Sequence, residues 1–75
     1  MSCACSYANR AMAYLKLKEF EKAELDCDEA LKLDSSFLKA YQRRSLARKE
    51  LGNERGALDD AEMALRLQPT SDVIL

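Results

Sequence analysis

Residues 7–33 read YANRAMAYLKLKEFEKAELDCDEALKL, and residues 41–67 read YQRRSLARKELGNERGALDDAEMALRL. The second stretch aligns with the first at a constant shift of 34 residues, without a gap. The identical pairs include Tyr7 with Tyr41, Arg10 with Arg44, Ala23 with Ala57, Asp26 with Asp60, and Ala30 with Ala64. Self-similarity at a period of this length is typical of stacked supersecondary units, so the sequence predicts an array of two such units.

Each unit predicts two helices, because apolar residues recur at helical spacing over about 4–17, 20–33, 37–51 and 54–67. Lys18 marks the turn inside the first unit, where the second unit has Gly52, a better helix stopper. Asp34, Ser35 and Ser36 break the pattern between the units and are expected to supply N-cap side chains. Small residues at equivalent positions, such as Ala11 and Ser45, suit the close approach of packed helices.

Length and composition bound the class of protein. With 75 residues the chain forms one small domain, and 33% charged with 48% apolar residues argues against both disorder and a membrane span. A net charge of −1 does not suggest a nucleic-acid partner. The absence of His removes the commonest general base and metal ligand. Three Cys and no apolar signal-like run favour a cytoplasmic protein, with a nuclear one as the alternative.

The spacing of Tyr7, Ala11, Tyr14, Ala23 and Ala30, repeated in the second unit, resembles the tetratricopeptide repeat. The resemblance implies an all-α fold: two helical hairpins stacked as a short right-handed α-solenoid, with four helices and a truncated fifth. It implies one domain over 1–75, with repeats at about 4–37 and 38–71 and the start of a further or capping helix at 72–75. Five residues depart from the family pattern, among them Ala61 and Cys27, which stand where the family often has Phe or a similar bulky residue. Arg48 replaces a large apolar residue, Lys18 a glycine, and Ser35 the proline that stands as Pro69.

The stretches 7–11, 26–27 and 39–44 further resemble the subgroup of this family that binds Hsp90 and Hsp70. In that subgroup a carboxylate clamp of basic and amide side chains grips the C-terminal Glu-Glu-Val-Asp tail of the chaperone. By position, Asn9, Lys39 and Arg43 match three of the five clamp residues, and the other two belong to a preceding repeat. The resemblance therefore implies a co-chaperone-type adaptor with a partial clamp. Other proteins of assembly complexes are further candidate partners, and the choice between Hsp90 and Hsp70 stays open.

The distribution of charge supports an anionic ligand independently of the resemblance. Residues 1–18 and 37–52 carry eight basic and one acidic side chain, whereas 19–35 and 53–68 carry four basic and eleven acidic. If the first helix of each repeat lines a common groove, that groove is basic. Lys39 and Arg43 are four residues apart on one helix face, and Asn9 occupies the position of Arg43 in the preceding repeat. Met12 and Leu46 share another equivalent position and are candidate contacts for an apolar side chain of the peptide.

Other residues favour structural roles. We expect Arg10 and Arg44 to pair with acidic residues of a neighbouring helix, with Asp26 as the partner of Arg44, and Cys27 to be a buried apolar residue. No catalytic constellation, metal site or cofactor motif is recognisable, so an enzyme is not expected. The alternative function is a structural scaffold or self-association unit without a clamp. Homo-oligomers through the open ends of the array are one expected outcome, and neither a nucleic acid nor a membrane is an expected partner.

Overall fold

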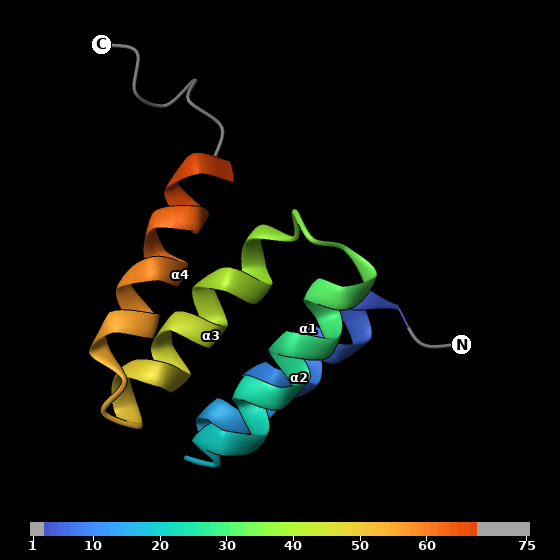
Figure 1. Ribbon diagram of the computed structural model, residues 1–75. Helices are drawn as coiled ribbons and strands as arrows, with labels where there is room; N and C mark the ends of the chain where they lie inside the picture. The colour runs from blue at the N-terminus through green and yellow to red at the C-terminus, as the bar shows by residue number, and fades with distance from the viewer. Residues whose placement is uncertain (1–2, 68–75) are drawn as a thin grey trace, which may run out of the picture.

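The computed structural model describes residues 3–67, which form two antiparallel helical hairpins. The first hairpin pairs α1 (Ala4–Lys16) with α2 (Phe20–Leu33), and the second pairs α3 (Leu38–Glu50) with α4 (Glu54–Leu67). Figure 1 shows α3 lying beside the α1–α2 pair, with α4 on its far side. The predicted all-α architecture of two stacked hairpins is confirmed, whereas the further helix expected at 72–75 lies outside the described residues.

The two hairpin turns share one backbone geometry. The N–H of Glu19 donates to the carbonyl of Tyr14 at 2.8 Å, and the N–H of Asn53 donates to the carbonyl of Arg48 at 2.8 Å. Such a bond closes a helix end when the residue before the donor is left-handed. That residue is Gly52 in the second turn, with φ +87°, and Lys18 in the first, with φ +63°. The first turn therefore holds a side chain in a conformation that favours glycine.

The link between the hairpins differs from the sequence prediction. Asp34 does not cap α3: its Oδ1 accepts bonds from the backbone N–H of Ser36 at 3.1 Å and from the Ser36 hydroxyl at 3.0 Å. The N-cap residue of α3 is Phe37, and no side chain caps that end. The polar residues of the link satisfy one another in a local turn, which is the conformation that competes with capping. The expectation that 34–36 would supply N-cap side chains was therefore wrong.

Small side chains make up the buried interior. Within residues 3–67, the buried apolar side chains are Ala8, Ala11, Ala23, Cys27, Ala30, Ala40, Ala47, Ala57 and Ala64. Ala11, Ala23, Cys27 and Ala47 form one cluster that joins the two hairpins, with Tyr14, Leu15 and Phe20 packed around it. Alanine lets helix backbones approach closely, while the aromatic residues fill the space at the edges. Cys27 is the buried small residue that the sequence predicted.

Candidate functional site

The predicted clamp residues come from two neighbouring helices, Asn9 from α1 and Lys39 and Arg43 from α3. A guanidinium N–H of Arg43 donates to the carbonyl oxygen of Ala8 at 2.7 Å, so Arg43 reaches the residue next to Asn9. Lys39 lies one helical turn before Arg43 and is exposed. Arg43 thus contacts α1 at Ala8, the neighbour of Asn9 in the chain, and Lys39 lies on the same helix face as Arg43.

Each of the three side chains keeps hydrogen-bonding capacity. Arg43 uses one N–H on Ala8, and a guanidinium carries five. The amide of Asn9 is exposed and, among residues 3–67, donates only to the Sγ of Cys5, at 3.6 Å. Sulfur is a weak acceptor, so a carboxylate oxygen would compete well for that amide. Lys39 makes no ion pair or side-chain hydrogen bond among the described residues, so its ammonium group is available to an anion.

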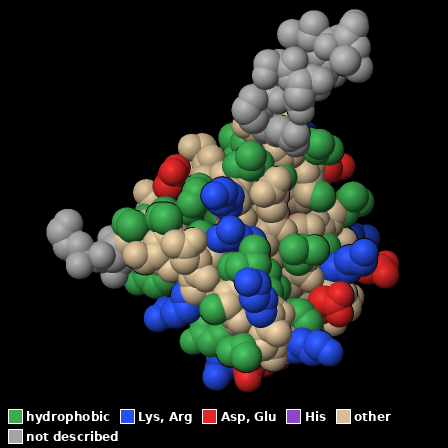
Figure 2. Space-filling model, turned by 180° about the vertical axis from the view of Figure 1, so that it is seen from behind, with side chains coloured by type: hydrophobic (Ala, Val, Ile, Leu, Met, Phe, Trp, Pro, Cys, Tyr) green, Lys and Arg blue, Asp and Glu red, His purple; other side chains and the backbone are tan. Residues whose placement is uncertain are grey.

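The charges are distributed as the sequence suggested. In Figure 1, α2 lies in front of α1, so the view from behind in Figure 2 shows the face that α1 lines. On that face, Lys and Arg side chains and hydrophobic side chains lie across the middle, and Asp and Glu side chains lie toward the margins (Figure 2). The Lys and Arg side chains in the middle of this face attract anionic ligands, and that attraction weakens as salt is added.

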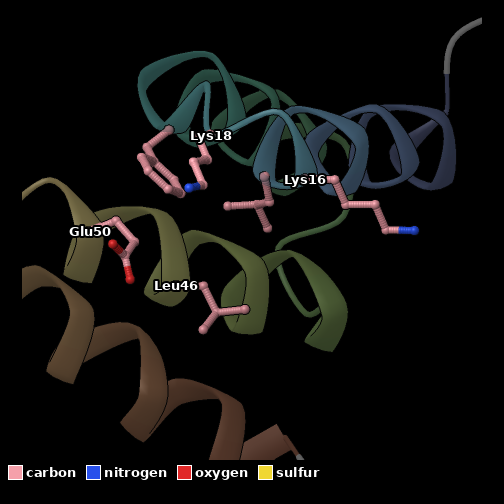
Figure 3. A pocket seen from close by; sticks show the side chains of 6 residues that line it. Lys16, Lys18, Leu46 and Glu50 are labelled. Atoms are coloured by element: carbon pink, nitrogen blue, oxygen red, sulfur yellow. The ribbon is translucent and has the colours of Figure 1, made fainter.

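A hollow of about 320 Å³, which we call the turn pocket, opens where the α1–α2 turn meets α3. Leu15, Phe20 and Leu46 supply its apolar wall, and Lys16, Lys18 and Glu50 its charged rim. In Figure 3, Leu46 and Glu50 stand on α3, across the hollow from Lys16 and Lys18. Leu46 was a predicted apolar contact and lines this pocket, whereas Met12 is half-buried on α1 and does not.

Sequence reasoning missed the other residues of the turn pocket. The pocket forms where three segments meet, so no single periodicity marks it. One feature of the sequence could have indicated the pocket. Leu15 and Phe20 are two large apolar residues on either side of the turn that contains Lys18. A large apolar residue next to a chain reversal has few neighbours from its own hairpin, so it stays partly uncovered.

Other charged residues next to the clamp hold the fold together. Arg10 donates from Nε and Nη2 to the carboxylate of Asp26 at 2.7 and 2.9 Å. Arg44 makes the same two bonds to Asp60, at 2.9 and 2.8 Å. The expected Arg44–Asp26 pair was wrong, because the hairpin places residue i of its first helix against residue i+16 of its second. Asp26 therefore belongs to Arg10.

Arg44 and Arg48 of α3 also bind acidic residues of α2, and these bonds cross between the hairpins. Arg44 Nη1 donates to Asp28 at 2.6 Å, and Arg48 bridges Glu24 at 2.6 Å and Asp60 at 3.1 Å. Arg48 thus replaces a large apolar residue of the family pattern with a half-buried ionic contact between α2, α3 and α4. The side chain of Asp60 is only 3% exposed and faces two guanidinium groups, so the network tolerates that burial by pairing its charge.

The comparisons with known proteins agree with this architecture. Residues 4–37 match the tetratricopeptide repeat family. The second tetratricopeptide domain of Spaghetti, solved with the Hsp90 peptide SRMEEVD, superposes with a TM-score of 0.87 at 49% identity, over 89% of this chain and 58% of that one. The fold and the matched repeat together define a chain of tetratricopeptide repeats.

Three individual proteins are similar to this chain at about 50% identity. Human RNA polymerase II-associated protein 3 is 52% identical over 63 residues, which are 84% of this chain and 10% of that protein. Sperm-associated antigen 1 of Rattus norvegicus is 49% identical over 69 residues, 91% of this chain and 8% of that protein. The myosin chaperone UNC-45 of C. elegans, solved with an Hsp90 peptide, has a TM-score of 0.85 at 51% identity, over 92% of this chain and 8% of that one. The chain thus spans about a tenth of the length of these relatives or less.

Membrane spans and metal clusters are absent from the described part of the chain. Between residues 3 and 67 no helix is both long enough and apolar enough to cross a bilayer. In the same range, no three His, Cys, Asp or Glu side chains come together as metal ligands. The clamp residues and the turn pocket are the candidate functional site.

Proposed function

We propose that this chain is a co-chaperone-type adaptor that binds the acidic C-terminal tail of Hsp90 or Hsp70. The observation that carries the proposal is the Arg43–Ala8 bond, because it holds the Arg43 guanidinium against α1 at the residue before Asn9. Lys39 adds an exposed ammonium group one turn away. A chain-terminal Asp offers two carboxylates, which accept hydrogen bonds and donate none, so the three donors complement it. Two relatives of about 50% identity were solved with Hsp90 peptides, which supports this ligand class.

The turn pocket supplies the second part of the proposed site. Leu46, which forms part of its wall, is three residues after Arg43 on α3, so an extended peptide held by the clamp reaches it within a few residues. An apolar side chain upstream of the acidic tail would bury itself against Leu15, Phe20 and Leu46. Met12 on α1 lies outside the lining of this pocket, and we propose it as a separate apolar contact of the peptide. With a partial clamp, we expect binding in the range of tens of micromolar, about 6 kcal/mol.

A titration with the peptide Met-Glu-Glu-Val-Asp tests the proposal. Amide resonances around Asn9, Lys39 and Arg43 should shift, and the shifts should vanish for the same peptide with an amidated C-terminus. Lys39→Ala should weaken binding about tenfold, because one charge-assisted bond is lost. Lys49→Ala, which removes an equal charge from the far end of α3, is the matched control and should change affinity less than about twofold.

Two results would contradict the adaptor function. Equal binding of the free and amidated peptides would mean that no terminal carboxylate is recognised. Equal losses for Lys39→Ala and Lys49→Ala would mean that the peptide responds only to the overall positive surface. Either result would favour a structural scaffold without a clamp. The proposed role is binding rather than catalysis, and we place the adaptor in the cytoplasm, with the nucleus as the alternative.

A further inference from the structure

A second hollow, which we call the open groove, lies between α3 and α4 on the side away from the first hairpin. It encloses about 580 Å³ and is lined by Gln42, Ser45, Leu46, Ala61, Ala64 and Leu65. Leu46 and Leu65 expose 54% and 68% of their surface, so the groove presents apolar area to solvent. An uncovered apolar surface of this kind marks a place where another element docks.

Comparison of the two repeats indicates which kind of element fits the open groove. The six lining residues stand 34 positions after Ala8, Ala11, Met12, Cys27, Ala30 and Leu31. In the first hairpin this same surface is covered by α3. Ala47 of α3 shares a buried cluster with Ala11 and Cys27, and Arg43 donates to the carbonyl of Ala8. The open groove is therefore the surface on which a helix like α3 packs.

The opposite end of the molecule carries such a helix. On α3, the docking face includes Ala40 and Ala47, which are fully buried. Their equivalents on α1 are Ser6 and Ala13, two small residues that are exposed. α1 thus turns outward the same face that α3 turns inward, and nothing within residues 3–67 covers it.

The charged groups at the two ends also correspond. Arg10 and Arg44 are equivalent, and each binds an Asp of its own hairpin through Nε and Nη2. Arg44 uses its remaining Nη1 to bind Asp28 of the preceding hairpin at 2.6 Å. Nη1 of Arg10 makes no bond within the described residues. The residue equivalent to Asp28 is Glu62 on α4, which is exposed and forms no ion pair among the described residues.

We propose that the open groove binds α1 of a second copy of this chain, with an ion pair between Arg10 of one copy and Glu62 of the other. The contact would repeat, between molecules, the packing of α3 on the first hairpin. Because the two docking surfaces are different, the assembly is head-to-tail and does not close at a dimer. The proposal uses the ends of the stack and none of the clamp residues Asn9, Lys39 and Arg43, although Leu46 lines both the open groove and the turn pocket.

Sedimentation or light scattering of this chain over a wide concentration range tests the proposal. The average mass should rise continuously from 8.5 kDa and pass the dimer value without a plateau. Leu65→Glu places a charge in the groove and should lower the association constant at least about tenfold. Leu25→Glu is the matched control, because Leu25 is similarly exposed at 61% but lies outside both docking faces. It should change association less than about twofold.

Charge reversal tests the predicted ion pair. Glu62→Arg sets two arginines against each other and should dissociate the assembly while helix content stays unchanged by circular dichroism. Adding an equimolar Arg10→Glu variant should restore mixed complexes, because the carboxylate introduced in one chain then meets the guanidinium introduced in the other. Circular dichroism of this variant comes first, because Arg10 also pairs with the buried Asp26. A constant mass of 8.5 kDa at every concentration would overturn the proposal, since the groove would then accept some other segment. Association that Leu65→Glu and Glu62→Arg leave unchanged would overturn it as well.

Discussion

The guanidinium of Arg43 on α3 donates to the carbonyl oxygen of Ala8 on α1, 35 residues earlier, at 2.7 Å. The bond links the two hairpins at the point where the proposed clamp lies. Arg43 therefore links the repeats through one N–H, and in the proposed function its other N–H groups are donors for the ligand. The two roles can be separated by comparison with Lys39, which makes no such contact in the described residues.

Arg43→Ala should reduce both peptide binding and stability. Loss of the bond to Ala8 should lower the free energy of unfolding by about 1–2 kcal/mol, because one charge-assisted hydrogen bond disappears from a half-buried site. Lys39→Ala should reduce peptide binding but change stability by less than about 0.5 kcal/mol. Urea denaturation and peptide titration of both variants check this. Equal stability of the two variants would show that the Arg43–Ala8 bond does not hold the hairpins together.

Asp60→Asn should be among the most destabilising single substitutions. The Asp60 side chain is 3% exposed and binds both Arg44 and Arg48, so its neutralisation leaves two cations close together without their shared counter-charge. The expected loss is about 3 kcal/mol or more. Asp26→Asn is the control, because its partner Arg10 is 57% exposed and solvent screens that pair, so we expect a clearly smaller loss. Thermal unfolding followed by circular dichroism measures both, and similar melting temperatures would contradict the difference.

Lys18→Gly should stabilise the chain. Lys18 adopts φ +63°, a region that disfavours a residue with a Cβ by about 1–2 kcal/mol. Glycine removes this strain, but it also raises the entropy of the unfolded chain, which offsets part of the stabilisation. We expect a net gain of about 0.5–1 kcal/mol. The reciprocal Gly52→Lys should destabilise by a similar amount or more, although an added Cβ there meets no atom within 4 Å. If Gly52→Lys left the urea midpoint unchanged, backbone conformation would not be the limiting factor in these turns.

Cys27 should react with thiol reagents much more slowly than Cys3 and Cys5. Burial raises the pKa of the Cys27 thiol from an ordinary value near 9 to about 12, whereas Cys3 and Cys5 are exposed. A hydrogen bond from the backbone of Ser6 lowers the pKa of Cys3. A thiol reagent at neutral pH should therefore modify Cys3 and Cys5 at once, and Cys27 only as the chain unfolds. Rapid labelling of all three in the folded chain, read by mass spectrometry, would contradict the burial of Cys27.

The same pKa shift predicts a loss of stability in alkaline solution. The folded chain holds the Cys27 proton more tightly than the unfolded chain does. The contribution is therefore fully present below the unfolded pKa near 9 and is lost as pH rises toward about 12. Cys27→Ala removes the titrating group and should flatten this dependence between about pH 9 and 11. Urea midpoints measured across that range compare the two chains.

The helices were predictable because the repeat reports the same pattern twice. The four expected ranges match the observed helices to within one residue at each end, from Ala4–Lys16 to Glu54–Leu67. Apolar periodicity is a local property of the sequence, so it predicts helices even when the packing of the helices is unknown. The buried state of Cys27 followed from the same periodicity.

The partners of the arginines were harder to predict. The pairing of Asp26 and Asp60 depends on the offset of 16 residues within a hairpin, whereas Asp28 meets Arg44 only because the hairpins stack. The sequence does not state that offset, so Asp26 was assigned to the wrong arginine. The turn pocket was missed for a similar reason, since Phe20 and Leu46 become neighbours only after the hairpins stack. The roles of Asn9, Lys39 and Arg43 in binding stay predictions until a peptide is titrated.

The alanines of the interior have a consequence for how such a chain changes over evolutionary time. The interior consists largely of alanine and has no room for larger side chains. A larger residue at Ala11 or Ala47 would force the packed helices apart. Variation is thereby directed to the outward positions, where Leu46 and Lys39 stand. If the proposed adaptor function holds, substitutions at these positions change which peptide tail is bound, while the helix packing beneath stays the same.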